Sequence, residues 1–271
     1  MPIVTISREF GSGGNEFGRA LARNLDFTYI DRKEILRNMK TLGKSWEKAG
    51  EEFDEQYPDV WERYDWSFRG YVTLSQSIIL NYGLKDRVVL MGRGGNFLFK
   101  DTPYALRIRL TRPKQVRIER IMKEENMSPD TARWFIEKVD KEMARTVQLI
   151  YCKSWNDPAE YDLHFDLGAI AEEEVIQRIK EALKEKAKLR TENAHKMLRL
   201  RAVAAKVKSA IATNPHLLVP TLDVEPTAEG IVLRGIIHNP REQKQIEEIA
   251  KNLAKDVPVK YDLLFRGMKR K

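Results

Sequence analysis

The residues best placed to do chemistry lie in a glycine-rich stretch near the N-terminus. Residues 3–6 are apolar or β-branched, residues 11–14 read Gly-Ser-Gly-Gly, and apolar positions at helical spacing begin with Phe17. Glycines let backbone N–H groups approach an anion, and a helix start adds unpaired donors with partial positive charge. The pattern therefore predicts that residues 11–16 bind phosphate. A purely structural turn between a strand and a helix is the alternative.

The stretch is not a regular Walker A sequence. That motif ends in Gly-Lys-Ser/Thr, whereas here Gly14 stands where the lysine belongs and Glu16 stands near the position of the hydroxyl. Taken alone, the phosphate prediction depends on the glycines and on the helix that follows them.

Two further polar residues follow expected strands. Residues 27–31 and 87–91 read as strands, and the strand-helix-strand spacing predicts a parallel α/β sheet. Asp31 ends the first of them, and Arg93 follows the second between Gly92 and Gly94. Open parallel sheets bind ligands at the carboxyl edge of their strands, so Asp31 and Arg93 are candidate ligand contacts. For Arg93 the alternative is an exposed side chain in a glycine turn.

Two expected helices carry many cations. Pro113 opens the first, which contains Arg117 and Arg120, and the pair Ser128–Pro129 has the residue types that start the second. The cations of this second helix are Arg133, Lys138, Lys141 and Arg145. A solvated charged helix face is the alternative to an anion-binding role for them.

Composition limits the class of protein. With 42% hydrophobic and 32% charged residues among 271, the chain is typical of folded globular proteins and long enough for two domains. It has no apolar run of about 18 residues, and the N-terminal residues lack the pattern of a signal peptide. The single Cys152 excludes an internal disulfide and fits a reducing compartment. We therefore expect a cytoplasmic protein.

Charge is distributed unevenly along the chain. Residues 190–271 contain 16 Lys/Arg against 9 Asp/Glu, a net charge of +7, whereas residues 1–189 carry a net charge of only +1. Such a break predicts two domains, residues 1–189 and residues 190–271. A cut near Arg190 is expected to remove little of the first domain's core.

Residues 34–84 are expected to be mostly helical and are rich in aromatic side chains. Clustered aromatic side chains form a small core or a helical flap more often than a base-stacking platform. The aromatic side chains of this segment are Trp46, Phe53, Tyr57, Trp61, Tyr64, Trp66, Phe68 and Tyr71.

The order of motifs over residues 1–185 resembles the cytidylate kinase-like family of P-loop nucleotide kinases. The motifs are ThrIleSerArgGluPheGlySerGlyGly at 5–14, TyrIleAsp at 29–31, GlyArgGlyGlyAsn at 92–96, LeuThrArgPro at 110–113, ValAspLysGlu at 139–142 and TrpAsnAspProAlaGluTyrAspLeu at 155–163. The resemblance implies a parallel sheet with helices on both faces, an acceptor-nucleotide flap and a cationic lid. In that family the glycine loop also lacks the Walker lysine.

The resemblance also implies a role for each candidate residue. The ATP phosphates would be bound by Gly11, Ser12, Gly13, Gly14, Asn15 and Glu16. Arg8 would replace the missing lysine, and Glu16 would hold Mg²⁺, since carboxylates suit that cation. Asp31 would organise the acceptor site or the waters of the metal, and Arg93 would bind the acceptor's phosphate. The lid cations would be Arg120, Lys138, Lys141 and Arg145.

Departures from the family pattern leave the function open. True cytidylate kinases carry Gly-Arg-Asp where this chain has Gly92–Arg93–Gly94, so an acceptor-site carboxylate is absent. Met143, Gln148 and Leu149 stand at lid positions that are often basic in the family. Fewer lid cations mean weaker stabilisation of the transferring group. The implied activity is ATP-dependent phosphoryl transfer to a nucleoside monophosphate, CMP or a similar one, or to a related small acceptor. The alternatives are a catalytically weak nucleotide-binding sensor acting through the C-terminal domain, and an adaptor for RNA or a membrane surface.

Residues 194–265 have a pattern of their own. The expected order is helix, two strands, helix and strand, an α+β domain of type αββαβ, and Asn239–Glu242 reads as a capping box with proline at the first helical position. With the phrase GlyIleValLeuArgGlyIleIleHis at 230–238, this order resembles a BON domain, a module associated with phospholipid or hydrophobic-ligand binding. Its basic surface would attract anionic lipid or RNA. A folded appendage with a solvated basic surface is the alternative. The oligomeric state is not indicated.

Overall fold

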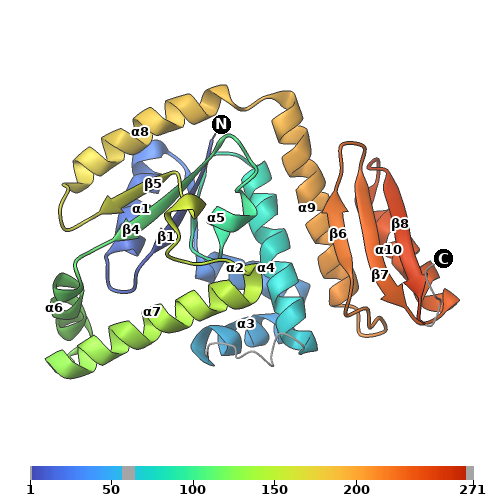
Figure 1. Ribbon diagram of the computed structural model, residues 1–271, viewed down its shortest axis with the longest axis horizontal. Helices are drawn as coiled ribbons and strands as arrows, with labels where there is room; N and C mark the ends of the chain where they lie inside the picture. Colours follow the sequence, from blue (N-terminus) through green and yellow to red (C-terminus); the bar gives the residue numbers. More distant parts are fainter. Residues whose placement is uncertain (1, 57–64, 267–271) are drawn as a thin grey trace. The chain divides into compact units, whose positions relative to one another are not determined.

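The computed structural model describes residues 2–56 and 65–266 of the chain (Figure 1). Its contacts divide these residues into two compact units. The first comprises the described parts of Met1–Ile35, Gln56–Pro58 and Lys85–Thr191, and the second those of Leu36–Glu55, Asp59–Leu84 and Glu192–Lys271. The boundary after Thr191 lies close to the break in charge, but the segment Leu36–Leu84 groups with the C-terminal part of the chain.

The first unit is built on a five-stranded sheet with the order β2-β3-β1-β4-β5. All four pairings are parallel. The strands are β1 (Ile3–Arg8), β2 (Thr28–Ile30), β3 (Val88–Met91), β4 (Ala105–Thr111) and β5 (Leu163–Asp166). Buried parallel strands are rich in apolar residues; β3 is entirely apolar, and in β1 Ile3, Val4 and Ile6 are buried. Because the strands are parallel, the residues that follow β1, β3 and β4 lie at one edge of the sheet.

Helices cover both faces of this sheet, which confirms the α/β class. On one face, α1 (Gly14–Leu25) and α8 (Glu172–Lys188) bury apolar stripes that include Phe17 and Ile179 against Val4, Ile6 and their neighbours. On the other, the short helix α5 (Gly95–Leu98) begins so close to β1 that a Cβ on Gly95 would lie 3.3 Å from Thr5 Cγ2.

Two helices of the first unit carry the cations singled out above. Helix α6 (Lys114–Glu125) packs on α7 (Pro129–Tyr151) through a small cluster of Ile118, Ile121, Ala132 and Ile136. Ser128 caps α7 as expected, because its hydroxyl accepts a hydrogen bond from the N–H of Thr131 at 3.3 Å. A turn of 3₁₀ helix, Pro158–Glu160, leads into β5.

The second unit contains helices from both ends of its sequence. These are α2 (Arg32–Leu42), whose first turn belongs to the first unit, α3 (Lys44–Gln56), α4 (Trp66–Leu84) and α9 (Glu192–Ala212). Helix α4 lies along α9 (Figure 1). Gly70 sits against the Trp46 ring and Thr213, and Arg69 Nη2 donates to the carbonyl of Pro220 at 2.8 Å.

This packing bears on two expectations. The prediction of an aromatic core in residues 34–84 is confirmed for Trp46, Phe68 and Tyr71, which are buried, and Phe53 stacks on Tyr71; Trp66, in contrast, is 41% exposed. Tyr57, Trp61 and Tyr64 lie outside the described residues. The expectation that a cut near Arg190 removes little core is wrong, because it would remove α9 and uncover the face of α4 that packs on it.

The rest of the second unit is a three-stranded sheet with order β6-β7-β8, formed by β6 (Asp223–Pro226), β7 (Ile231–Ile237) and β8 (Val259–Phe265). The pair β6/β7 is antiparallel and β7/β8 is parallel, joined by α10 (Pro240–Ala254). The expected αββαβ order is therefore confirmed. Asn239 Oδ1 accepts from the N–H of Glu242 at 2.9 Å, and the Glu242 carboxylate accepts from the N–H of His238, so the predicted helix cap is present.

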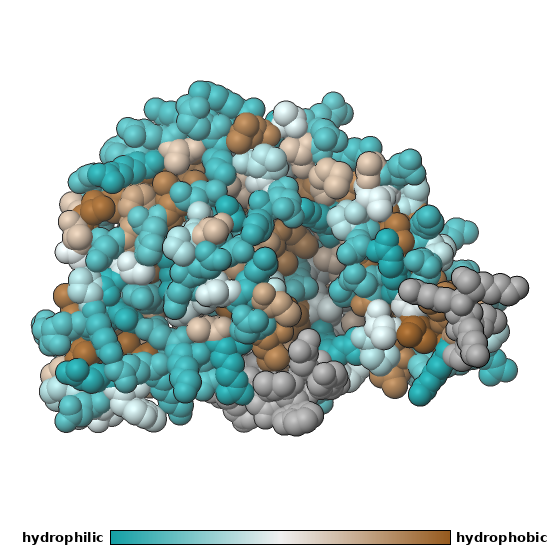
Figure 2. Space-filling view, viewed as in Figure 1, coloured by the Kyte–Doolittle hydropathy of each residue, from teal (hydrophilic) through white to brown (hydrophobic). Residues whose placement is uncertain are grey.

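The surface is mixed in polarity. On the face drawn in Figure 2, hydrophilic residues predominate and hydrophobic ones are scattered among them, which is normal for a protein surface. Among the described residues, no helix combines the length and apolarity needed to cross a bilayer.

Candidate functional site

The glycine loop is held in a conformation that requires glycine. Gly11 and Gly13 have φ angles of 72° and 81°, in the left-handed region that glycine adopts without a steric cost. Gly13 is the N-cap of α1, and the helix begins at Gly14. The first turn of a helix leaves N–H groups without helical acceptors. The loop therefore presents backbone donors and the positive end of α1 to the same place.

A cavity of about 140 Å³ lies over this loop. All six residues predicted to bind phosphate line it, together with Arg8 and Arg120. The rest of its wall is formed by Glu9, Phe10, Ile121, Glu124, Glu125 and Met143. The structure thus places two predicted cations at the predicted phosphate loop.

Arg8 connects two glycine turns. Its Nε donates to Asn15 Oδ1 at 3.0 Å, and a Cβ on Gly14 would lie only 2.7 Å from Arg8 Cβ. On the other side, a Cβ on Gly92 would lie 2.8 Å from Arg8 Nη1. Since β1 and β3 are neighbours, the Arg8 side chain passes between the loops that follow these two strands. Its position suits the role predicted for it, a replacement for the Walker lysine.

Arg120 reaches the loop from α6. Its guanidinium contacts Glu16 at 3.3 Å and Glu124 at 2.7 Å, and a Cβ on Gly13 would lie 2.5 Å from its Nη1. An anion bound at the loop would compete with these two carboxylates for Arg120. The contact also places a carboxylate, that of Glu16, at the start of α1.

The donor set at the loop suits magnesium only together with phosphate. Among the described residues, no group of three or more His, Cys, Asp or Glu side chains could hold a metal by itself. Mg²⁺ is usually bound by one or two carboxylates plus phosphate oxygens and water. Glu16, in the wall of the cavity, can supply one such carboxylate.

The predicted acceptor residues lie outside the cavity wall. Asp31 caps α2, because its Oδ1 accepts from the N–H groups of Lys33 and Glu34 at 3.0 and 3.3 Å, while Oδ2 pairs with Arg19 at 3.2 Å. Arg93 has a φ of 57°, and its carbonyl accepts a hydrogen bond from the hydroxyl of Tyr151 at 3.0 Å. Both residues follow strands at the carboxyl edge of the sheet, as expected.

The cations of α7 are not brought to the loop. Lys138 lies over the ring of Trp134, Arg145 pairs with Glu142 at 3.4 Å, and Lys141 is exposed. The α7 side chain in the cavity wall is instead Met143. The sequence contained a signal for this arrangement, since Ala132, Ile136, Val139 and Met143 follow helical spacing and the first three are buried.

Sequence reasoning did not find the residues that hold the loop in place. Asp140 accepts from the N–H of Phe10 at 3.1 Å and from Nη1 of the buried Arg117 at 2.6 Å. The same Nη1 donates to the carbonyl of Phe10 at 3.0 Å, and the Arg117 Nε lies 3.5 Å from the Glu9 carboxylate. Glu9 also accepts from the N–H of Arg112 at 3.3 Å. Asp140 and Glu9 stand inside quoted motifs, but only the fold pairs them with Arg117.

A second buried group fixes the end of β1. Ser7 Oγ receives hydrogen bonds from Arg109 Nη1 at 3.0 Å and from Trp155 Nε1 at 2.9 Å. The Arg109 guanidinium lies 3.8 Å from the centre of the Trp155 ring, and Tyr161 OH donates to the Trp155 carbonyl at 2.7 Å. Burial lowers the pKa of Arg109 and raises that of Tyr161. This group ties the segment after α7 to the strand from which the loop departs.

Comparison with known proteins agrees with this geometry. Residues 3–169 match the model of the Cytidylate kinase-like family. The chain belongs to this family. A cytidylate kinase from Pyrococcus abyssi is 28% identical over 184 residues, 67% of this chain and 93% of the relative. One from Thermococcus sibiricus is 27% identical over 164 residues, 59% of this chain and 77% of the relative.

Comparison with solved structures concerns the fold, and a second family model matches the C-terminal part of the chain. A crystal structure of an uncharacterized protein from Eubacterium ventriosum matches 68% of this chain and 98% of its own length, with a TM-score of 0.53 and 20% identity. This likeness supports the fold of the family domain. Residues 200–267 match the model of the BON domain, as the order of elements predicted.

The loop geometry predicts that Gly13→Val abolishes the phosphate site. A branched side chain at a φ of 81° is strained, and its Cβ would take the space of the Arg120 guanidinium. We expect the Kd for ATP, measured by calorimetry, to rise about 100-fold or more, since small displacements of a binding group cost about that much. Asn24→Ala, exposed in the last turn of α1, is the control. Unchanged ATP affinity in folded Gly13→Val protein would remove the loop from the site.

The anchoring network predicts that Asp140→Ala lowers the free energy of unfolding by ~2 kcal/mol. The change leaves the buried Arg117 and the N–H of Phe10 without their acceptor. Glu142→Ala, two residues along α7, removes only the pair with the half-exposed Arg145 and should cost at most ~1 kcal/mol. Urea denaturation of both variants gives the comparison. Equal losses would mean that Asp140 does not anchor the loop.

Proposed function

We propose that this protein transfers a phosphoryl group from ATP to a nucleoside monophosphate, CMP or a similar one, or to a related small acceptor. One observation carries the proposal: the strand, glycine loop and helix start enclose a cavity of about 140 Å³ that Arg8 and Arg120 also line. Phosphoryl transfer needs positioning and neutralisation of charge more than covalent chemistry. The cytidylate kinases among its relatives support a nucleotide acceptor.

Different residues at the site are assigned to the phosphates of ATP, to the metal and to the acceptor. The N–H groups at the start of α1 and the Arg8 guanidinium hold the phosphates of ATP. Glu16 and phosphate oxygens would hold Mg²⁺, which neutralises phosphate charge when bound. Arg120 exchanges its contacts with Glu16 and Glu124 for the phosphate, and the released carboxylate of Glu16 becomes available to the metal. Asp31 and Arg93 are assigned to the acceptor.

One observation favours a second candidate, a nucleotide-binding sensor with weak catalysis. The α7 residue in the cavity wall is Met143, while Lys141 and Arg145 are not part of that wall. A methionine cannot neutralise the charge of a transferring phosphoryl group. The protein would then bind ATP through the loop and turn it over slowly.

A turnover screen of nucleoside monophosphates with ATP and Mg²⁺ tests both candidates. The kinase proposal predicts saturable transfer to one class of monophosphate by the wild-type protein, with none in Gly13→Val. The sensor proposal predicts tight ATP binding with negligible phosphoryl transfer to every acceptor. Absence of both binding and transfer in folded protein would contradict the two together.

The variant Met143→Arg sharpens the comparison. A guanidinium at this point of the cavity wall should raise kcat by about tenfold or more, since single arginines stabilise the phosphoryl-transfer transition state strongly. Met143→Leu keeps the apolar wall and should leave kcat within about twofold, as a volume-conserving substitution does little. If Met143→Arg leaves kcat unchanged in folded protein, this position does not face the transferring group.

For the BON domain we propose contact with an anionic lipid surface. Residues 193–222 carry five basic side chains and no acidic ones, and the family resemblance favours a phospholipid. Binding to vesicles containing phosphatidylserine should weaken steeply as salt rises. The double variant Lys196→Glu/Lys206→Glu on α9 should weaken it more than the matched Lys180→Glu/Lys184→Glu on α8. Salt-independent binding, or preference for RNA over vesicles, would contradict the lipid assignment.

A further inference from the structure

Strand β8 is an edge strand that its own domain leaves incompletely covered. In the part of the chain that the structure describes, it pairs only with β7. None of its seven residues is buried, although five are apolar or aromatic. On the outer face Leu264 is 37% exposed, and its register partner Ile236 is 42% exposed. A long apolar edge of this kind is a template for pairing with another strand.

The backbone of β8 offers hydrogen bonds at this edge. The carbonyl of Pro258 accepts from Ile231 N at 2.9 Å, and the N–H of Arg266 donates to the carbonyl of Ile237 at 2.8 Å. Backbone groups of successive residues in a strand point to opposite sides, so even-numbered residues of β8 face β7. The N–H and C=O groups of residues 259, 261, 263 and 265 therefore point to the free edge.

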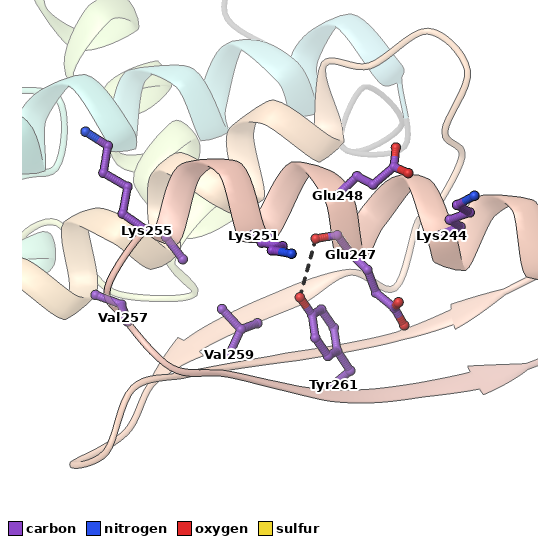
Figure 3. A pocket seen from close by; sticks show the side chains of 9 residues that line it. Lys244, Glu247, Glu248, Lys251, Lys255, Val257, Val259 and Tyr261 are labelled. Carbon is purple, nitrogen blue, oxygen red and sulfur yellow. Dashed lines mark hydrogen bonds between the residues drawn. The ribbon is translucent and has the colours of Figure 1, made fainter.

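A groove of about 500 Å³ lies between α10 and β8 (Figure 3). Its apolar part includes Val257, Val259 and the ring of Tyr261, whose hydroxyl donates to the carbonyl of Glu247 at 3.5 Å. The side chains of α10 and of the residue that follows it carry both signs of charge along the groove: Lys244, Glu247, Glu248, Lys251 and Lys255. A surface with both signs suits a self-complementary partner better than a strongly anionic ligand.

We propose that β8 pairs antiparallel with β8 of a second copy, about a two-fold axis at Tyr261. Opposite charges within β8 select this register. A register centred on 264 would also oppose unlike charges, Asp262 and the partner's Arg266, but Arg266 lies beyond the end of β8 and only residues 263–265 of the strand would then pair with each other. In a register centred on residue 260, Lys260 would face the partner's Lys260. In a register centred on residue 262, Asp262 would face the partner's Asp262. Centred on 263, Lys260 would face the partner's Arg266. Only the register centred on 261 sets Lys260 against the partner's Asp262, and it does so twice.

This register also pairs three of the four edge-facing residues of β8. Residues 259, 261 and 263 meet as hydrogen-bonded pairs, with Val259 opposite the partner's Leu263 and Tyr261 opposite the partner's Tyr261. Lys260 and Asp262 then form non-hydrogen-bonded pairs, in which side chains approach more closely. The interface is isologous, with the same surface contributed by both copies.

Variants of the full chain in which the charges at 260 and 262 are reversed singly or swapped test the proposal. Sedimentation equilibrium should show a wild-type dimer whose Kd rises about tenfold or more in Lys260→Asp and in Asp262→Lys, because each change sets like charges opposite each other twice. The double variant Lys260→Asp/Asp262→Lys should return the Kd to near the wild-type value. Lys184→Asp, the same charge change at an exposed lysine of α8, should leave it unchanged.

Three results would overturn the proposal. A wild-type chain that stays monomeric across the concentration series has no such interface. A dimer insensitive to both single changes uses another surface. A folded double variant that stays as weak as the single ones shows that Lys260 and Asp262 do not face each other. Melting curves establish folding, which matters most for Asp262→Lys because Asp262 also lies 3.6 Å from Arg234.

Discussion

The close approach of two guanidinium groups to a glycine loop is the constraint on which the candidate site depends. A Cβ on Gly13 would take the place of Arg120, and a Cβ on Gly14 would collide with Arg8. The same absence of side chains that lets phosphate reach the backbone thus lets the cations reach the loop. The loop lacks the Walker lysine, and its positive charge comes instead from Arg8 at the end of β1 and from Arg120 on α6. The loop and these two side chains therefore depend on each other.

Buried polar groups hold the glycine loop in place. Arg117 is a charge out of water, and it is stable because Asp140, Glu9 and the carbonyl of Phe10 surround it. Helix α7 supplies both Asp140, which holds the loop, and Met143, which forms part of the cavity wall. A displacement of α7 would therefore break the hydrogen bond to Phe10 and alter the wall at the same time.

The second unit shows that sequence order and packing order differ. Helix α4, in the first third of the chain, packs along α9, in the last third. A side chain on Gly70 would collide with the Trp46 ring, and Thr213 lies next to the same position. Helix α9 therefore contributes to a core that begins at Leu36. Experiments on either domain are better made on the full chain, since separating α9 from α4 would expose apolar residues of both helices.

The sequence by itself determined much of the fold. Apolar runs at β1 and β3, the cap at Ser128–Pro129 and the cap at Asn239 are local signals, because a few neighbouring residues suffice to favour a strand or to end a helix. The glycines at 11–14 likewise marked the loop, since few other residues adopt positive φ angles readily. The order of motifs then indicated the family domain and the BON domain.

Only the tertiary structure decided which cations reach the loop. Lys141 and Arg145 are as basic as Arg120, and nothing in their identity excludes them. The rotation of α7 about its axis is set by the burial of Ala132, Ile136 and Val139, and it turns Asp140 and Met143 toward the loop instead. The pairing of Arg117 with Asp140, and of α4 with α9, joins residues far apart in sequence. Such contacts depend on how whole elements pack, which no local pattern of residues specifies.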